Sequence, residues 1–293
     1  MFRRQGARSS TFRGAVVIIA MMASSCQTSL RSSREVCPDG LQLVQKKIET
    51  GYEISAANHC QVPMMVELLM GQLDNLRSLD ALPAHRVVAE GSVERMVTLE
   101  QIDPRSPARF QSRLGVTWWG ATPPATQSTY LYAYPFGGSD PRRLVQGVDG
   151  AFTHSGRARY AFDFEMPIGT PIVASRAGVV LLAVDGYGDG GFEESNRDEG
   201  NGVFVLHEDG TLATYGHLSA GIKVRAGDAV AEGDSLGLSG NSGYTKGPHL
   251  HFQVSTQVPG GFDSIPIRFR GDVVPVEGEL FGPYPGPRAR AGE

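Results

Sequence analysis

The chain has 293 residues, 41% hydrophobic and 20% charged, which is enough for one large domain or two ordinary ones with real cores. This composition excludes disorder of the whole chain. With 27 Lys and Arg against 31 Asp and Glu, a net charge of −4, the basic surface that binds phosphate backbones is absent, so no nucleic-acid partner is expected. The 37 glycines, about 13% against a usual share of about 7%, indicate many tight turns between short strands.

Residues 1–25 have the order of a secretory signal peptide. Four arginines precede an apolar run over 14–23, too short to span a bilayer, and two serines then lead to Cys26. This order resembles the lipobox of bacterial lipoproteins, in which the cysteine is lipidated, and Gln27 resembles the class sorted to the outer membrane; an ordinary signal peptide is the alternative. We expect export, as an outer-membrane lipoprotein facing the periplasm and attached through Cys26, or else as a periplasmic or cell-surface protein.

The segment 26–121 is predicted to form a small β-sandwich-like domain. Cys37 and Cys60 flank two consecutive strand-like runs, and an oxidising compartment would allow them to form a disulfide; two free thiols in a small core are the alternative. His59 and His85 stand alone and are interpreted as surface or structural residues. Runs bounded by turn residues, each typical of a strand, lie at 40–48, 52–56, 62–70, 85–89, 93–100 and 110–119.

A stretch rich in Pro, Thr and Ser at 122–128 predicts a linker over 122–133. The composition then changes, since 25 of the 37 glycines lie in 137–271. Long helical periodicity is missing there, so residues 134–271 are predicted to form a nearly all-β domain. Its β-branched runs lie at 171–174, 178–184, 203–207, 211–215 and 249–254.

Two segments of this half are expected to lie outside the sheet. The acidic insertion 185–201 lacks the glutamate that ends a calcium-binding loop and is interpreted as a solvated, flexible loop. The tail 272–293 is rich in Pro and Gly, so we expect it to be extended, with Phe281 and Tyr284 packed back on the sheet.

The strongest chemical signal is a pair of histidines, His249 and His251, in one strand-like run. Residues i and i+2 of a strand point to the same face, so both imidazoles face one cavity. Upstream, His154 and Asp163 form a second element, and His217 ends another run. A catalytic zinc takes three protein ligands and leaves a fourth position for water, and two histidines with one aspartate fit this count.

From residue 134 to 254 the chain resembles the M23 (lysostaphin/LytM-type) zinc metallopeptidases. The resemblance is carried by a His…Asp element at 154–163, Tyr-Gly-His-Leu at 215–218, and Gly-x-x-x-Gly-x-His-Leu-His-Phe at 243–252. It implies a LytM/M23-type antiparallel β-sheet domain of the duplicated hybrid motif kind, and so a mainly β fold for the whole chain. One departure is that eight residues separate His154 from Asp163, where the common form of the family has three.

The resemblance implies one Zn²⁺ per chain, with His154, Asp163 and His251 as its ligands. A zinc site of this kind lowers the pKa of a bound water toward about 7. It makes His217 and His249 the unliganded catalytic histidines, of which one takes a proton from the water and the other donates to the oxyanion, in an order left open. His207 matches no such position.

The family implies a metalloendopeptidase that hydrolyses peptide bonds in peptidoglycan stem or cross-bridge peptides. One alternative is a non-enzymatic LytM-like regulator or wall-binding module that activates a cell-wall amidase. Such members have lost metal ligands, and the presence of all five histidine and aspartate positions argues against it. A peptidase for proteins or peptides outside the wall is a further alternative.

Overall fold

The computed structural model describes residues 40–120, 123–258 and 261–282. Across these ranges the chain is built of strands, with two short 3-10 helices and no α-helix. Neither 3-10 helix has the length and apolar character that crossing a membrane requires. The mainly β prediction is therefore confirmed. The predicted signal peptide, Cys26, Cys37 and Tyr284 lie outside the described residues.

The first seven strands form two antiparallel sheets that enclose one core. They are β1 (Leu41–Ile48), β2 (Gly51–Asn58), β3 (Met64–Asp74), β4 (Leu76–Ser78), β5 (Ala84–Val88), β6 (Val93–Gln101) and β7 (Arg109–Trp119). One sheet has the order β1-β2-β6-β4 and the other β5-β3-β7. Alternate residues of β3, namely Met64, Val66 and Leu68, are fully buried, as expected of a strand with one face on a core. The arrangement is the small sandwich predicted from the strand-like runs.

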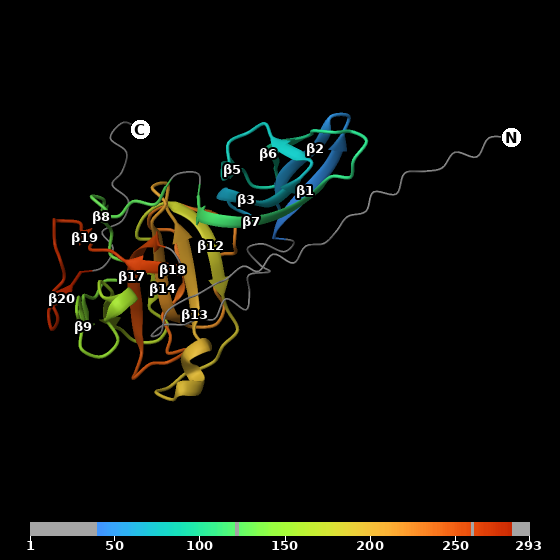
Figure 1. Cartoon of the computed structure of the whole chain (residues 1–293). Helices are drawn as coiled ribbons and strands as arrows, with labels where there is room; N and C mark the ends of the chain where they lie inside the picture. Colours follow the sequence, from blue (N-terminus) through green and yellow to red (C-terminus); the bar gives the residue numbers. More distant parts are fainter. Residues whose placement is uncertain (1–39, 121–122, 259–260, 283–293) are drawn as a thin grey trace, which may run out of the picture.

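The second half of the chain is organised around one large antiparallel sheet (Figure 1). Its strands are β9 (Arg142–Gln146), β10 (Phe162–Glu165), β12 (Gly178–Val184), β13 (Asn201–Leu206), β14 (Leu212–Leu218), β15 (Ala229–Val230), β17 (His249–Val258), β18 (Gly261–Ser264) and β20 (Leu280–Phe281). The order is β15-β12-β13-β14-β17-β10-β9-β20, and β18 pairs with β17. Two small pairs flank it: β11 (Pro171–Val173) with β16 (Ser235–Leu238), and β8 (Leu131–Tyr132) with β19 (Arg268–Phe269).

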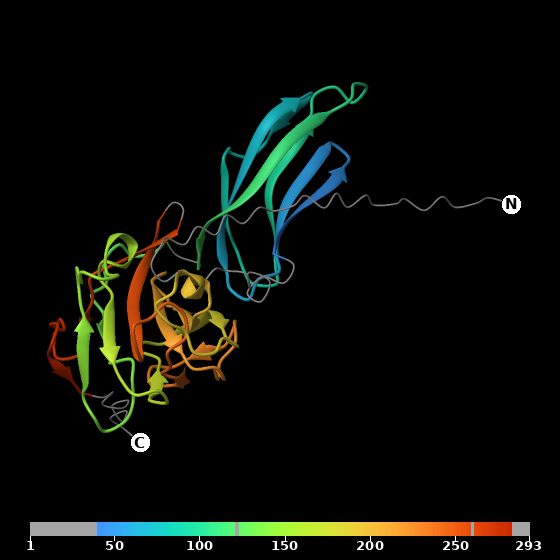
Figure 2. The ribbon, with the colours of Figure 1, turned by 90° about the horizontal axis from the view of Figure 1, so that it is seen from below.

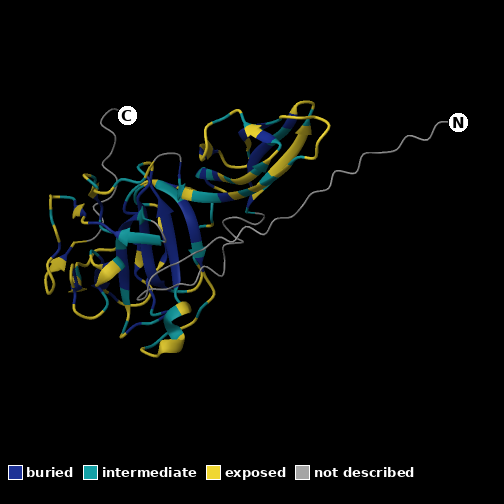
Figure 3. Cartoon of the chain, viewed as in Figure 1, coloured by how far each residue is buried: buried dark blue, intermediate teal, exposed yellow. Residues whose placement is uncertain are grey.

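Both faces of the large sheet are covered around β13. Every residue of this strand is buried, and Figure 3 shows the central strands as a buried band. Val203 and Val205 belong to the core of the second half, whereas Phe204 and Leu206 belong to the same cluster of buried side chains as the first seven strands. Since alternate residues of a strand face opposite sides, β13 joins the two cores.

The two halves of the chain are therefore in direct contact. The elongated sandwich projects from one side of the second half (Figure 2), and the backbone N–H of Trp119 donates to Oε1 of Gln257 at 2.8 Å. Tyr132 in β8 is fully buried, although it falls within the stretch 122–133 that the sequence assigns to a linker. The domain limits themselves stay predictions.

The acidic insertion differs from the flexible loop expected. Most of its residues are exposed, but it carries a 3-10 helix (Glu194–Asp198) and is hydrogen-bonded to the turn before β17. Gly190 N–H donates to Asn241 O at 2.7 Å, and Gly191 N–H donates to Gly243 O at 3.0 Å. A Cβ on Gly190 would lie 2.0 Å from Gly243 O, so a glycine is needed for this approach. Main-chain hydrogen bonds hold the insertion in place.

The described part of the C-terminal tail packs on the sheet, as expected. Phe281 lies in β20, pairs with β9 and is buried. Its ring centroid is 5.9 Å from that of Tyr134 and 6.3 Å from that of Phe164. The tail thus extends the large sheet at the edge next to β9.

Candidate active site

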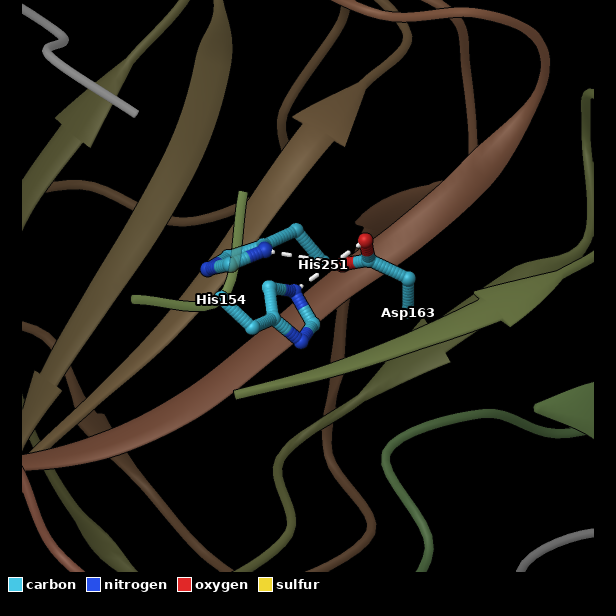
Figure 4. A group of neighbouring side chains, drawn as sticks. All are labelled: His154, Asp163 and His251. Carbon is cyan, nitrogen blue, oxygen red and sulfur yellow. Dashed lines mark hydrogen bonds and ion pairs between the residues drawn. The ribbon is translucent and has the colours of Figure 1, made fainter. Parts of the chain in front are cut away.

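Three side chains converge at the junction of β9, β10 and β17. Figure 4 shows His154, Asp163 and His251 pointing toward one another; the first comes from the turn after β9, the second from β10 and the third from β17. Asp163 pairs directly with His251 in the antiparallel register of β10 and β17. Their potential ligand atoms lie within 4.8 Å of one another, and all three residues are buried. This cluster could hold a metal ion.

The donor atoms of the cluster fit a cation. His154 Nδ1 lies 2.7 Å from Gly147 O, and because a carbonyl accepts, Nδ1 carries the proton and Nε2 carries the lone pair. In the neutral ring Nε2 therefore faces Asp163 Oδ2, 3.1 Å away, with no proton to donate to it. Two buried lone pairs facing each other are costly unless a proton or a cation lies between them. Two imidazoles and one carboxylate are a common ligand set for catalytic zinc.

His217 and His249 lie beside this cluster. Their ring centroids are 4.5 Å apart, and the centroid of His217 is 6.1 Å from that of His251. His217 Nδ1 donates to Ser242 O at 2.7 Å, and His249 Nδ1 donates to Gly247 O at 2.8 Å. In both rings Nε2 is therefore the acceptor nitrogen. All five residues that the sequence singles out are thus brought into one site.

A bulge in β14 presents His217. In the pairing of β14 with β13, Gly216 lies opposite Gly202 and Leu218 opposite Asn201, which leaves His217 as the extra residue. Its φ of 60° is in the left-handed region, which a histidine seldom adopts. Bulges re-aim side chains next to functional sites, and strained backbone of this kind is concentrated there.

The pKa values of two residues in the site are strongly shifted. Burial alone would raise the pKa of Asp163, but the imidazoles of His154 and His251 hold it well below its usual range. Burial, reinforced by His249 and His251, lowers the pKa of His217 to about 3. The resting site therefore combines an ionised carboxylate with a neutral His217.

The remaining described histidines lie elsewhere. His207 is buried, its Nδ1 lies 2.9 Å from Ala177 O, and burial lowers its pKa to about 4. His85 is exposed and pairs with Glu67 at 3.2 Å, and His59 is exposed. None of these three belongs to the cluster, which agrees with the roles expected from the sequence.

The sequence reasoning missed the groups that orient the site. Gln146 donates from Nε2 to Asp163 Oδ2 at 2.9 Å. The other orienting groups are the main-chain carbonyls of Gly147, Ser242 and Gly247. Every residue type has a main-chain carbonyl, so the amino-acid sequence does not reveal which carbonyls orient the site. Gln146 stands 17 positions before Asp163, so no local motif links the two.

Residues 157–260 match the model of peptidase family M23, so this part of the chain belongs to that family. The peptidoglycan DD-endopeptidase ShyA of Vibrio cholerae is 37% identical over 115 residues, which are 39% of this chain and 23% of that protein. Lysostaphin of Staphylococcus simulans is 39% identical over 100 residues, which are 34% of this chain and 18% of lysostaphin. The chain thus spans less than a quarter of the length of either relative.

Among solved structures, the catalytic domain of the antimicrobial peptidase lysostaphin from Staphylococcus simulans is similar, at 28% identity over 46% of this chain and 88% of that one. Its TM-score of 0.28 is too low to support an argument about the fold. His154 lies three residues before the family match, whereas Asp163, His217, His249 and His251 lie within it. The spatial cluster therefore supplies the reason to group His154 with the others.

Proposed function

We propose that this chain is a zinc metalloendopeptidase that hydrolyses peptide bonds in peptidoglycan stem or cross-bridge peptides. The observation that carries the proposal is a buried cluster of two imidazoles and one carboxylate, with two more imidazoles beside it, within a domain of family M23. The relationship to a peptidoglycan DD-endopeptidase supports this substrate class.

The ligands in this proposal are His154 through Nε2, His251 through Nδ1, and the carboxylate of Asp163. These are the atoms that face one another across the cluster. A zinc ion bound there supplies a Lewis acid for the scissile carbonyl and acidifies a water. The ionised state of Asp163 provides the negative charge that a divalent cation requires.

Of the two histidines outside the ligand set, His249 is the better placed to carry a proton through the reaction. Its side chain is 14% exposed, and its Nε2 lies 3.8 Å from Asp163 Oδ1, so a positive charge there is partly solvated and faces a carboxylate. A charge on His217 would be buried beside two other imidazoles. We therefore assign the proton shuttle to His249, and assign His217 to accept a hydrogen bond that orients the attacking water.

Digestion of purified peptidoglycan tests the proposal. The zinc-loaded protein is expected to release peptide-cleaved fragments, a chelator is expected to stop the reaction, and zinc is expected to restore it. His251→Ala is expected to be inactive. Cleavage that survives His251→Ala would overturn the metal-dependent mechanism, and binding of the wall without cleavage by zinc-loaded protein would favour the non-enzymatic regulator instead.

We also propose that the protein works outside the cytoplasm. The order of arginines, apolar run and small residues before Cys26 supports export. Cys60 is disulfide-bonded, a state that an oxidising compartment permits; its pairing with Cys37 stays a prediction. Mass spectrometry of the mature protein tests both points, since lipidation adds acyl mass to Cys26 and reduction of a Cys37–Cys60 bond adds two hydrogen atoms.

A further inference from the structure

Gln146 is a buried amide whose hydrogen-bonding groups are all used. It ends β9, lies opposite Asp163 in the register with β10, and is 7% exposed. Its Nε2 donates to Asp163 Oδ2 at 2.9 Å and to Thr153 Oγ1 at 2.6 Å. Its Oε1 accepts the backbone N–H groups of Phe152 at 2.9 Å and Thr153 at 3.2 Å. Two donors and two acceptor positions are the full capacity of an amide.

The two main-chain donors decide which way this amide points. An NH₂ group in place of Oε1 would face the N–H groups of Phe152 and Thr153, donor against donor. The oxygen must therefore occupy that position, and the NH₂ group must face the carboxylate of Asp163. The orientation of the amide thus follows from its partners.

Gly150 makes room for this side chain. A Cβ on Gly150 would lie 2.2 Å from Gln146 Cγ and 2.9 Å from its Cδ. The φ of Gly150 lies outside the left-handed region, so the glycine is required by this contact. The turn 147–153 therefore closes around Gln146. The same turn supplies Gly147 O, which accepts the proton of His154 Nδ1.

We propose that Gln146 is a positioning residue for the metal centre. It acts on one ligand directly, through Asp163 Oδ2, and on a second through the turn that anchors and carries His154. The inference depends on the metal site of the proposed function. Removing an outer hydrogen bond of this kind typically weakens metal binding by about 10–100-fold.

Gln146→Met tests the role, because it keeps the length of the side chain and removes every hydrogen bond. We expect the Kd for Zn²⁺, measured by competition with a chromophoric chelator, to rise by about 10–100-fold. The absorption bands of the Co²⁺-substituted protein are expected to change in position and intensity, a change that a loss of global stability would not produce. Gln101→Met, the same substitution in the first half of the chain, is the control and should bind Zn²⁺ as the wild type does.

A double-mutant cycle removes the dependence on a single variant. Gly150→Ala leaves the amide in the chain but forces it to move, so we expect weaker Zn²⁺ binding in the wild-type background. In a Gln146→Ala background the Cγ atom is gone and the added Cβ has only Gly147 O close by, at 3.0 Å, so Gly150→Ala should have a much smaller further effect on Zn²⁺ affinity. Thermal unfolding of each metal-free variant identifies those that are folded.

Folded Gln146→Met and Gly150→Ala variants with wild-type Zn²⁺ affinity would overturn the inference, as would additive losses in the cycle. Failure of the proposed function has a different signature. In that case the wild-type protein itself either fails to bind Zn²⁺, or binds it and leaves peptidoglycan uncut. The binding measurements use no substrate, so the two failures are distinguishable.

Discussion

His217 and His249 both donate from Nδ1 to a main-chain carbonyl, but the main chain and the burial of His217 set it apart. It occupies the extra position of a bulge with φ of 60°, it is 6% exposed, and its Nδ1 is fixed on Ser242 O. Such a residue faces the reaction from a rigid position and has little access to bulk water. This arrangement suits a group that orients a water molecule.

His217→Ala is therefore expected to lower kcat on peptidoglycan fragments by about 10²-fold, because the hydrogen-bond acceptor that orients the attacking water is lost. Zn²⁺ should still bind with one ion per chain, since His217 is not among the three converging ligands. Elemental analysis and steady-state kinetics check the two parts. Asp163→Ala is the matched contrast and should lose both zinc and activity. Loss of zinc in His217→Ala would contradict the assignment.

His207 connects burial to the pH dependence of stability. Burial lowers its pKa to about 4 from 6.5, with Arg176 adding to this effect and the Ala177 carbonyl and Asp209 opposing it. The unfolded chain takes up a proton below about pH 6.5 and the folded chain below about pH 4, so stability falls as the pH falls through this window. The difference corresponds to about 3 kcal/mol.

His207→Gln, which can still donate to Ala177 O, should remove this contribution. We expect its free energy of unfolding to depend less steeply on pH between 4 and 6.5 than that of the wild type. Urea unfolding at a series of pH values measures the difference. Parallel pH profiles for the two proteins would show that the imidazole is not held neutral.

The acidic insertion between β12 and β13 supports the turn that holds His217. Gly190 and Gly191 bond to that turn at residues 241 and 243, on either side of Ser242, whose carbonyl accepts the proton of His217 Nδ1. A shift of the insertion would move this acceptor. The insertion is thus exposed to solvent and at the same time supports the site.

Gly190→Ala is expected to displace the turn, because its Cβ would lie 2.0 Å from Gly243 O and 2.5 Å from Gly243 N. We expect kcat to fall by at least tenfold and Zn²⁺ affinity to stay unchanged, since the ligands come from other elements. Gly188→Ala in the same insertion is the control, because a Cβ there meets nothing within 4 Å. Equal activity of the two variants would show that the insertion does not support the site.

Several elements could be predicted because their signals are local. The His-Leu-His run alternates as a strand does, and pairing of β10 with β17 brings Asp163 to His251. The bulge at His217 and the docking of the insertion could not be predicted. Both depend on main-chain hydrogen bonds between residues far apart in the sequence, to which every residue type contributes alike.

At the scale of the whole molecule, the sandwich and one face of the large sheet share one of the two cores. The run Val203–Phe204–Val205–Leu206 indicates a strand covered on both faces, but it carries no sign of which element covers the second face. In the structure the sandwich covers this second face, since Phe204 and Leu206 belong to the buried cluster of the first seven strands. We therefore expect the two halves predicted from the sequence to unfold as one cooperative unit.

Leu206→Ala tests this continuity. Leu206 is 7% exposed, so the substitution should cost about 2–5 kcal/mol through lost contacts and a cavity. Calorimetry should show one unfolding transition, shifted as a whole to lower temperature. Leu238→Ala, at a position that is 38% exposed, should shift it little. Two separate transitions, of which only one moves, would contradict a shared core.

Three site imidazoles are held from outside by the main-chain carbonyls of Gly147, Ser242 and Gly247. Every amino acid carries such a carbonyl, and at Gly247 an added Cβ would meet nothing within 4 Å. We therefore expect substitutions at these positions to preserve the support as long as the backbone keeps its course. Insertions and deletions in the same turns would move the acceptors, so we expect the lengths of these turns to be more restricted than their residue types.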